Sequence, residues 1–237
     1  MIALVVARRE WGSFFRTSSG WVIIALYLLL SGFWFAFGAL EPGAPATLRA
    51  FFGVSQWILL IVGPAISMRL IADERRSGTI ESLSTAPVSD WEVVIGKYAG
   101  AVGFLLTMLS PTLLYVLLLE AVSDPDYGPI VAGYVGLLLV GMLYLSAGTL
   151  FSALTENQVV ALLATVFFFL VLELVAVQGG RMLGPPWDTR LFALSVLLRV
   201  GDLSKGVIDS AHVAAFVGAS AWFLVLAVAA LEWRRWR

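Results

Sequence analysis

The sequence predicts an all-α polytopic membrane protein with six transmembrane helices. Of its 237 residues, 60% are hydrophobic and only 13% are charged, whereas soluble domains carry about a quarter charged residues. The mean hydropathy of +0.92 agrees with a membrane class. A transmembrane helix needs roughly 20 mostly apolar residues, and six windows satisfy this requirement: 20–40, 52–71, 93–119, 129–152, 159–178 and 213–233.

The residues before the first window, 2–16, are too few and too charged to cross a membrane. Apolar and aromatic side chains share a broad face of a helix drawn through them, whereas Arg8, Arg9 and Arg16 can reach lipid headgroups. This pattern is typical of an amphipathic helix that lies in the membrane interface. We therefore expect an amino-terminal interfacial helix over 2–16.

The second and third windows contain Pro64 and Pro111, and membrane helices tolerate such kinks when neighbouring groups satisfy the freed backbone. Two capping boxes predict where the third and fifth helices begin, the first at Ser89 and the second at Thr155. The fourth window carries a face of small residues, which favours close helix packing: Gly141, Ser146, Ala147 and Gly148.

The distribution of positive charge predicts the orientation, because cytoplasmic loops carry an excess of Lys and Arg. Ten Lys and Arg residues lie on the side of the two termini and 72–91, and five lie on the other side. This places both termini and 72–91 in the cytoplasm. Residues 179–212 then lie outside, where their mixed apolar and charged pattern predicts a re-entrant or interfacial helical hairpin.

One stretch of the chain, 68–100, reads like ordinary soluble protein. We expect a charged turn at 73–76, a short helical piece at 79–84, and a Lys97 side chain that extends to the membrane surface. A solvated loop with weak internal ion pairs would explain the charges. However, about 20 residues exceed the 2–8 that usually connect bundled helices, which favours a docking surface. The two interpretations stay open on these grounds alone.

The same stretch resembles the coupling region of ABC type-2 permeases, the membrane subunits of ATP-driven exporters. In that family an E-R-R-x-G-T-x-E-x-L segment follows the second span, and a P-x-S/T-x-x-E/D turn leads through a G-K pair into the third. The resemblance implies an ATPase-coupling site here at Asp73, Glu74, Arg75, Arg76, Gly78, Thr79, Glu81, Leu83, Pro87 and Ser89. Glu92, Gly96 and Lys97 complete the match, and weaker similarity at 152–161 and 203–216 resembles the gliding-motility and nitrous-oxide-reductase-maturation branch.

This resemblance implies a multi-pass subunit of a bacterial or archaeal plasma (inner) membrane exporter. Residues 72–91 would dock on an ATPase, and two separate ATPase subunits would bind ATP and Mg. A second permease chain, identical or homologous, would complete the transporter. The chain itself is not expected to be an enzyme and needs no cofactor, because its sequence contains no G-x-x-x-x-G-K-[ST] motif.

Composition argues against several other functions. The net charge is −1, which gives no basic field for nucleic acid. Cysteine is absent and His212 is the one histidine, so we expect neither a metal site nor a catalytic site. An intramembrane enzyme is therefore disfavoured. A secondary transporter or channel usually shows several intramembrane charges or paired repeats. This sequence shows one intramembrane glutamate and no visible repeat between its two halves, which argues against that class. A scaffold that uses the same ATPase-docking segment remains an alternative.

Glu173 lies in the middle of the fifth window. An ionised carboxylate there is costly unless it is paired or faces water, so such residues are usually functional. We expect Glu173 to lie on the transport pathway or at a dimer interface. The alternative is a protonated glutamate that forms hydrogen bonds to a neighbouring helix.

Overall fold

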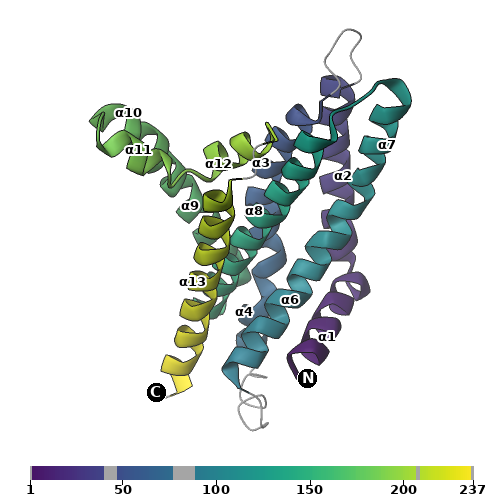
Figure 1. Cartoon of the computed structure of the whole chain (residues 1–237). Coiled ribbons are helices and arrows are strands. Elements are labelled where there is room, and N and C mark those ends of the chain that lie inside the picture. Colours follow the sequence, from purple (N-terminus) through teal and green to yellow (C-terminus); the bar gives the residue numbers. More distant parts are fainter. Residues whose placement is uncertain (1, 40–46, 77–88, 207–208, 236–237) are drawn as a thin grey trace.

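A computed structural model describes residues 2–39, 47–76, 89–206 and 209–235, and within these ranges the protein contains helices and no strands. Six helical segments in this part of the chain are long and apolar enough to span a membrane, as the sequence predicts. They are Ser18–Ala39, Arg49–Arg76, Asp90–Val122, Tyr127–Leu154, Gln158–Leu183 and Ser210–Trp233. The segments form a bundle, and the two termini lie at the same end of it (Figure 1).

Several of these segments contain more than one helix. The elements are α1 (Ile2–Arg16), α2 (Ser18–Ala39), α3 (Arg49–Ser67), α4 (Arg69–Arg76), α6 (Asp90–Leu109), α7 (Leu113–Val122), α8 (Tyr127–Leu154), α9 (Gln158–Leu174), α10 (Gly180–Leu183), α11 (Trp187–Phe192), α12 (Val196–Leu203) and α13 (Ser210–Arg235). A 3₁₀ turn at Ser110–Thr112 joins α6 to α7, and a π-helical turn at Val175–Gly179 joins α9 to α10.

Helix α8 is the centre of the bundle, and α3, α6, α9 and α13 pack around it. Its small residues are buried, as predicted, and they allow the neighbouring helices to approach closely. A Cβ atom added at Gly141 would collide with Leu105 of α6, and one added at Gly148 would collide with Ser67 of α3. Gly63 of α3 serves the same purpose, because a Cβ there would lie 2.7 Å from the Cβ of Tyr144.

Helix α1 packs lengthwise along α6. Gly96 and Gly100 form the contact surface on α6, where added Cβ atoms would lie 2.8 Å from the Ala3 carbonyl oxygen and 2.7 Å from the Ala7 carbonyl oxygen. Further along, the Trp11 indole donates a hydrogen bond of 3.1 Å to Thr107 Oγ1. The helix over 2–16 is therefore attached to the bundle, while its position in a membrane interface stays a prediction.

The two intramembrane prolines coincide with changes in helix geometry. Pro111 lies in the 3₁₀ turn and has no N–H for the Thr107 carbonyl oxygen, which accepts a hydrogen bond of 2.9 Å from Ser110 Oγ instead. Pro64 lies inside α3, which ends three residues later, and α4 restarts the helix after Met68. The second and third spans are therefore each built from two helical pieces.

The short helices α10, α11 and α12 lie at the end of the bundle opposite the termini, and α10 and α11 project to one side (Figure 1). Large apolar side chains are exposed on this projection: Met182, Leu183 and Trp187. Gly184 ends α10 with a φ of 61°, a conformation that glycine adopts without strain. Re-entry of this region into a membrane stays a prediction.

Candidate functional site

A buried ion cluster joins α1, α4 and α6 at the end of the bundle that carries the termini. Lys97 of α6 is only 4% exposed. Its Nζ contacts Glu74 Oε1 of α4 at 2.8 Å and Glu10 Oε2 of α1 at 3.6 Å, and it donates a hydrogen bond of 2.6 Å to the Leu70 carbonyl oxygen. The expectation that Lys97 extends to the membrane surface is wrong, because the side chain finds partners inside the bundle. We call Glu10, Lys97 and Glu74 the charge junction.

The electrostatics of the charge junction make its members interdependent. The side chains of Glu10 and Glu74 are 15% and 16% exposed, and that of Lys97 is 6% exposed. Removing charges from water is costly, and attraction to a close partner of opposite sign offsets that cost. Loss of Lys97 would leave two buried carboxylates close together without their shared cation. The cluster therefore holds the three helices together only while it is complete.

Arg69 attaches α4 to the connection between α1 and α2. Its guanidinium carbon lies 4.0 Å from the centre of the Phe14 ring, a cation–π contact. Its Nη1 donates hydrogen bonds of 3.2 Å to Thr17 Oγ1 and to Ser19 Oγ. Phe14 also stacks on Phe104 of α6, with 4.4 Å between ring centres. These contacts reinforce the attachment made by the charge junction.

The start of α4 is fixed to α8 through Ser152. The first N–H groups of a helix have no partner within it, and Ser152 Oγ accepts hydrogen bonds from Ile71 N at 3.1 Å and Ala72 N at 2.9 Å. The same hydroxyl donates a hydrogen bond of 2.8 Å to the Met68 carbonyl oxygen. One serine thus satisfies the backbone where the helix restarts.

The charged residues at the end of α4 also contact the bundle. Arg75 Nη1 donates a hydrogen bond of 2.5 Å to the Ala153 carbonyl oxygen, and Gln158 of α9 donates one to Asp73. The charged turn expected at 73–76 is wrong, because these residues form the last turn of α4. Their contacts with α6, α8 and α9 allow the helix to continue through four consecutive charged residues.

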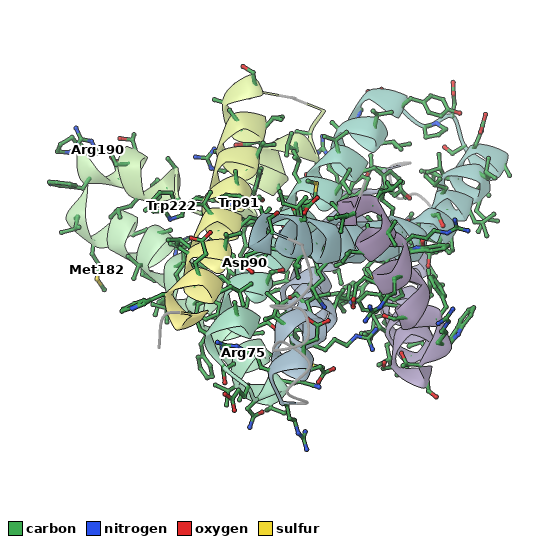
Figure 2. The ribbon with its side chains drawn as sticks, turned by 90° about the horizontal axis from the view of Figure 1, so that it is seen from below. Arg75, Asp90, Trp91, Met182, Arg190 and Trp222 are labelled. Carbon is green, nitrogen blue, oxygen red and sulfur yellow. The ribbon has the colours of Figure 1, made fainter. Side chains whose placement is uncertain are left out.

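The start of α6 is fixed by the predicted capping box. Ser89 Oγ accepts a hydrogen bond of 3.2 Å from Glu92 N, and Glu92 Oε2 accepts one of 3.2 Å from Ser89 N. Arg75 and Asp90 lie toward the middle of the bundle when this end faces the viewer, well apart from Met182 and Arg190 (Figure 2). Arg75 and Ser89, on the two sides of 77–88, are therefore both held by hydrogen bonds.

The second predicted capping box is wrong. Asn157 caps α9 in place of Thr155, because its Oδ1 accepts a hydrogen bond of 2.9 Å from Val159 N. The Gln158 side chain, which a Thr155 box would use, is directed to Asp73.

The structure places only some of the predicted coupling residues. Asp73, Glu74 and Arg75 face the bundle, and Arg76 is exposed. Ser89 caps α6. The remaining five lie outside the described residues, so their coupling role stays a prediction: Gly78, Thr79, Glu81, Leu83 and Pro87. Sequence reasoning missed the contribution of Glu10, which lies more than 60 residues before Glu74 and shows no signal except its acidity.

Glu173 fixes α12 to α9 within this chain. Its carboxylate accepts a hydrogen bond of 3.1 Å from Val196 N and another from Ser195 Oγ, and Ser195 is the N-cap of α12. A carboxylate at the start of a helix is favourable because the N-terminus carries partial positive charge. These contacts satisfy Glu173 without a second chain. A role in a pathway or at a dimer interface stays a prediction.

Across the described ranges, no group of three or more His, Asp or Glu side chains is arranged to hold a metal ion.

Comparison with known proteins supports one family. A sequence model described as "ABC-2 family transporter protein" matches residues 43–183, more than half of this chain. The "Probable multidrug ABC transporter permease YbhR" of Escherichia coli strain K12 is 22% identical over 138 residues, which are 58% of this chain and 37% of that protein. The protein of the same name from Escherichia coli O157:H7 matches equally. The chain thus spans little more than a third of the length of these relatives.

Proposed function

This chain belongs to the ABC-2 family of transporter membrane proteins, and from that premise we propose that it is the permease subunit of an ATP-binding cassette exporter. The coupling segment 72–91 docks on a separate ATPase subunit through 77–88, and ATP-driven movement of that subunit is passed to the helix bundle. The family is a membrane component of transporters rather than a catalytic subunit, so ATP and Mg are bound by the partner.

The observation that carries this proposal is the charge junction. Lys97 and Glu74 lie on the two helices that flank 77–88, and their 2.8 Å ion pair joins those helices just beside the segment. Glu10 adds α1 to the same cluster. A loop that served only to connect two spans would not need buried charges of this kind, because exposed ion pairs and solvent suffice there.

The proposed mechanism is a rigid movement of α1, α4 and α6 together. Force on 77–88 reaches α4 and α6 at once, because the charge junction couples them. Two interruptions, one at Met68 and one at Ser110–Thr112, lie between this block and the far end of the same two spans. Such breaks absorb changes of backbone angle in hinge motions. The block can therefore tilt without unwinding the bundle.

The complete transporter contains two ATPase subunits and a second permease chain, identical or homologous. It lies in the plasma (inner) membrane of a bacterium or archaeon, with both termini and 77–88 in the cytoplasm. The excess of positive charge at this end supports that orientation. The sequence similarity at 152–161 and 203–216 supports the gliding-motility and nitrous-oxide-reductase-maturation branch of the family.

A pull-down from the native membrane in mild detergent tests the proposal. The test variant scrambles 77–86 and leaves Asp73–Arg76 intact, because the end of α4 contacts the bundle. The control scrambles 40–46, which joins α2 to α3 at the other end. We expect the wild type and the control to retain an ATPase with a P-loop, and the test variant to lose it. A chain that purifies alone, or with partners that include no ATPase, would favour a channel or a secondary transporter.

A further inference from the structure

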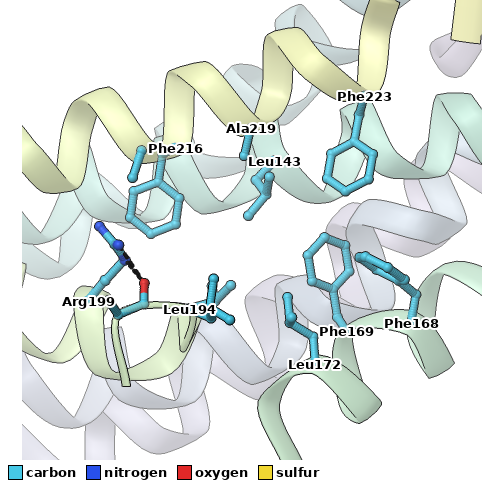
Figure 3. Close-up of a pocket in the computed structure, with 12 residues that line it drawn as sticks. Leu143, Phe168, Phe169, Leu172, Leu194, Arg199, Phe216, Ala219 and Phe223 are labelled. Atoms are coloured by element: carbon cyan, nitrogen blue, oxygen red, sulfur yellow. Dashed lines mark hydrogen bonds between the residues drawn. The ribbon is translucent and has the colours of Figure 1, made fainter. Parts of the chain in front are cut away.

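An apolar cavity lies between α9 and α13, beside the short helices at the end of the bundle opposite the termini. Both helices pack on α8, with Leu143 of α8 behind the cavity (Figure 3). The cavity has a volume of about 210 Å³. Its walls are largely aromatic and aliphatic: Phe168, Phe169 and Leu172 from α9, and Phe216, Ala219 and Phe223 from α13. Ring contacts of Phe223 with Phe168 and Phe169, 5.7 and 6.3 Å between centres, close one end.

A second cavity of about 520 Å³ adjoins the first, and Ala193 and Arg199 line both. Its lining is apolar in larger part but includes charged side chains, so we call it the polar cavity. The polar cavity also contains Asp202, Lys205 and His212. Lys205 and Asp202 form an ion pair of 2.8 Å, so their charges compensate. Arg199 therefore supplies the net positive charge at the boundary between the apolar and the polar space.

Arg199 is held in place by the backbone rather than by a carboxylate. Its Nε donates a hydrogen bond of 2.7 Å to the Ala193 carbonyl oxygen, and its Nη2 donates to the same oxygen (Figure 3). Within the described part of the chain, Arg199 forms no salt bridge and its Nη1 donates no hydrogen bond. The guanidinium is thus pre-oriented and keeps donors for an external anion, and Arg is well suited to phosphate because of its planar fork of donors.

We propose that these two cavities form a binding site for an anionic membrane phospholipid. One acyl chain lies between α9 and α13 against the phenylalanine side chains, and the phosphate binds Arg199 in the polar cavity. Two observations select this occupant over an apolar helix of a partner. The apolar space ends at a charged space instead of continuing along the bundle, and the net charge of that space is positive. An arginine guanidinium can bind a phosphate group through two parallel N–H donors.

This inference does not depend on the proposed transport function, because it concerns one chain and needs no ATPase. His212 contributes a further polar group, since its buried Nδ1 has no hydrogen-bond partner among the described residues. The net charge favours a phosphatidylglycerol-type headgroup over phosphatidylcholine, whose ammonium group would compensate its own phosphate.

Photo-crosslinking in lipid nanodiscs tests the proposal with the full chain. The nanodiscs contain phosphatidylcholine and a trace of one of two probes, phosphatidylglycerol or phosphatidylcholine, each with a diazirine on the same acyl chain. Mass spectrometry then locates the labelled peptides. We expect the phosphatidylglycerol probe to label 168–172 and 215–223 about tenfold more than the phosphatidylcholine probe, because only the phosphatidylglycerol headgroup brings a net negative charge to Arg199.

Two pairs of variants separate the acyl site from the phosphate site. Arg199→Gln should reduce labelling by the anionic probe to the level of the zwitterionic probe, whereas Arg181→Gln, an exposed residue of α10, should not. Ala219→Trp should fill the apolar cavity and reduce labelling of the buried Phe169 and Phe216 by both probes. Ala221→Trp places the same side chain on an exposed face of α13 and should leave labelling unchanged.

Three results would overturn the proposal. The first is equal labelling by the two probes in the wild type. The second is an Arg199→Gln variant that keeps the wild-type preference. The third is a wild-type protein whose 168–172 and 215–223 carry no label from either lipid probe.

Discussion

Replacing Lys97 with methionine should destabilise the protein strongly, because it removes the cation from the charge junction. Methionine extends as far as the Cε atom of lysine and lacks only the terminal ammonium group, so the change is mainly one of charge. The carboxylates of Glu10 and Glu74, 15% and 16% exposed, lose the ammonium group that lies 3.6 and 2.8 Å from them. The Leu70 carbonyl oxygen loses its 2.6 Å donor as well.

The size of the effect follows from the burial of the three groups. Breaking a buried ion pair by removing one partner costs about 3–5 kcal/mol. For a chain of this length each kcal/mol shifts the unfolding temperature by about 2–4 °C. We therefore expect Lys97→Met to lower the apparent unfolding temperature by about 10 °C. Size-exclusion chromatography of the detergent-solubilised protein after heating for a fixed time measures this shift.

A matched control is available at the other end of the bundle. Lys205 and Asp202 form an ion pair with the same 2.8 Å distance, but their side chains are 60% and 50% exposed. Exposed pairs contribute about 0–1 kcal/mol, so Lys205→Met should shift the temperature by no more than about 4 °C. The triple variant Lys97→Met with Glu10→Gln and Glu74→Gln should recover more than half of the loss, since no charge then remains buried. The reasoning is refuted if Lys97→Met behaves like Lys205→Met, or if the triple variant is no more stable than the single one.

Three further predictions address other parts of the molecule. Glu173→Gln should weaken the attachment of α12, at a cost of about 1.5–3 kcal/mol for hydrogen bonds to a charged group. Backbone hydrogen exchange at 195–203 should therefore become faster, and unchanged exchange would contradict this role. Gly100→Val should destabilise by about 1–3 kcal/mol through overpacking against α1, whereas Gly218→Val, in open space, should be neutral in the same heating assay. Equal effects of the two valines would show that α1 does not pack there. The chain has no cysteine, so single cysteines introduced at Arg76 and at Asp188 can report its orientation. A membrane-impermeant thiol reagent should label the cysteine at 188 but not the one at 76 in intact cells. The reverse labelling pattern would invert the proposed topology.

The six spans could be predicted from the sequence because each depends on local composition. About 20 apolar residues in a row specify a membrane helix whatever surrounds them. The capping box at Ser89 is equally local, since both of its hydrogen bonds join residues three apart. The small residues of α8 were also informative, because close packing of a central membrane helix requires them.

The charge junction could not be predicted, because it depends on contacts between distant residues. Glu10 and Lys97 are 87 positions apart, and only the packing of α1 on Gly96 and Gly100 brings them together. The same limitation explains the wrong expectation of a charged turn at 73–76. Local sequence shows four charged residues in a row, whereas the structure supplies partners from three other helices.

Glu173 shows an intermediate case. The sequence indicated that a carboxylate in a membrane span needs a partner, and the structure provides Ser195 and Val196 from α12. Which partner it has could not be deduced, because α12 returns to α9 through the irregular region that contains α10 and α11. The sequence therefore indicated that Glu173 needs a partner but not that the partner is the start of α12.

The most direct test of the central claim is photo-crosslinking from the segment that we propose to dock on the ATPase. A photoreactive amino acid at Glu81 would be activated in the native membrane, with the exposed Asp124 between α7 and α8 as the control position. We predict that Glu81 crosslinks to a separate protein that carries a P-loop, and that Asp124 does not. A correctly inserted chain whose Glu81 position crosslinks only to lipid, or to a protein without a P-loop, would contradict the account.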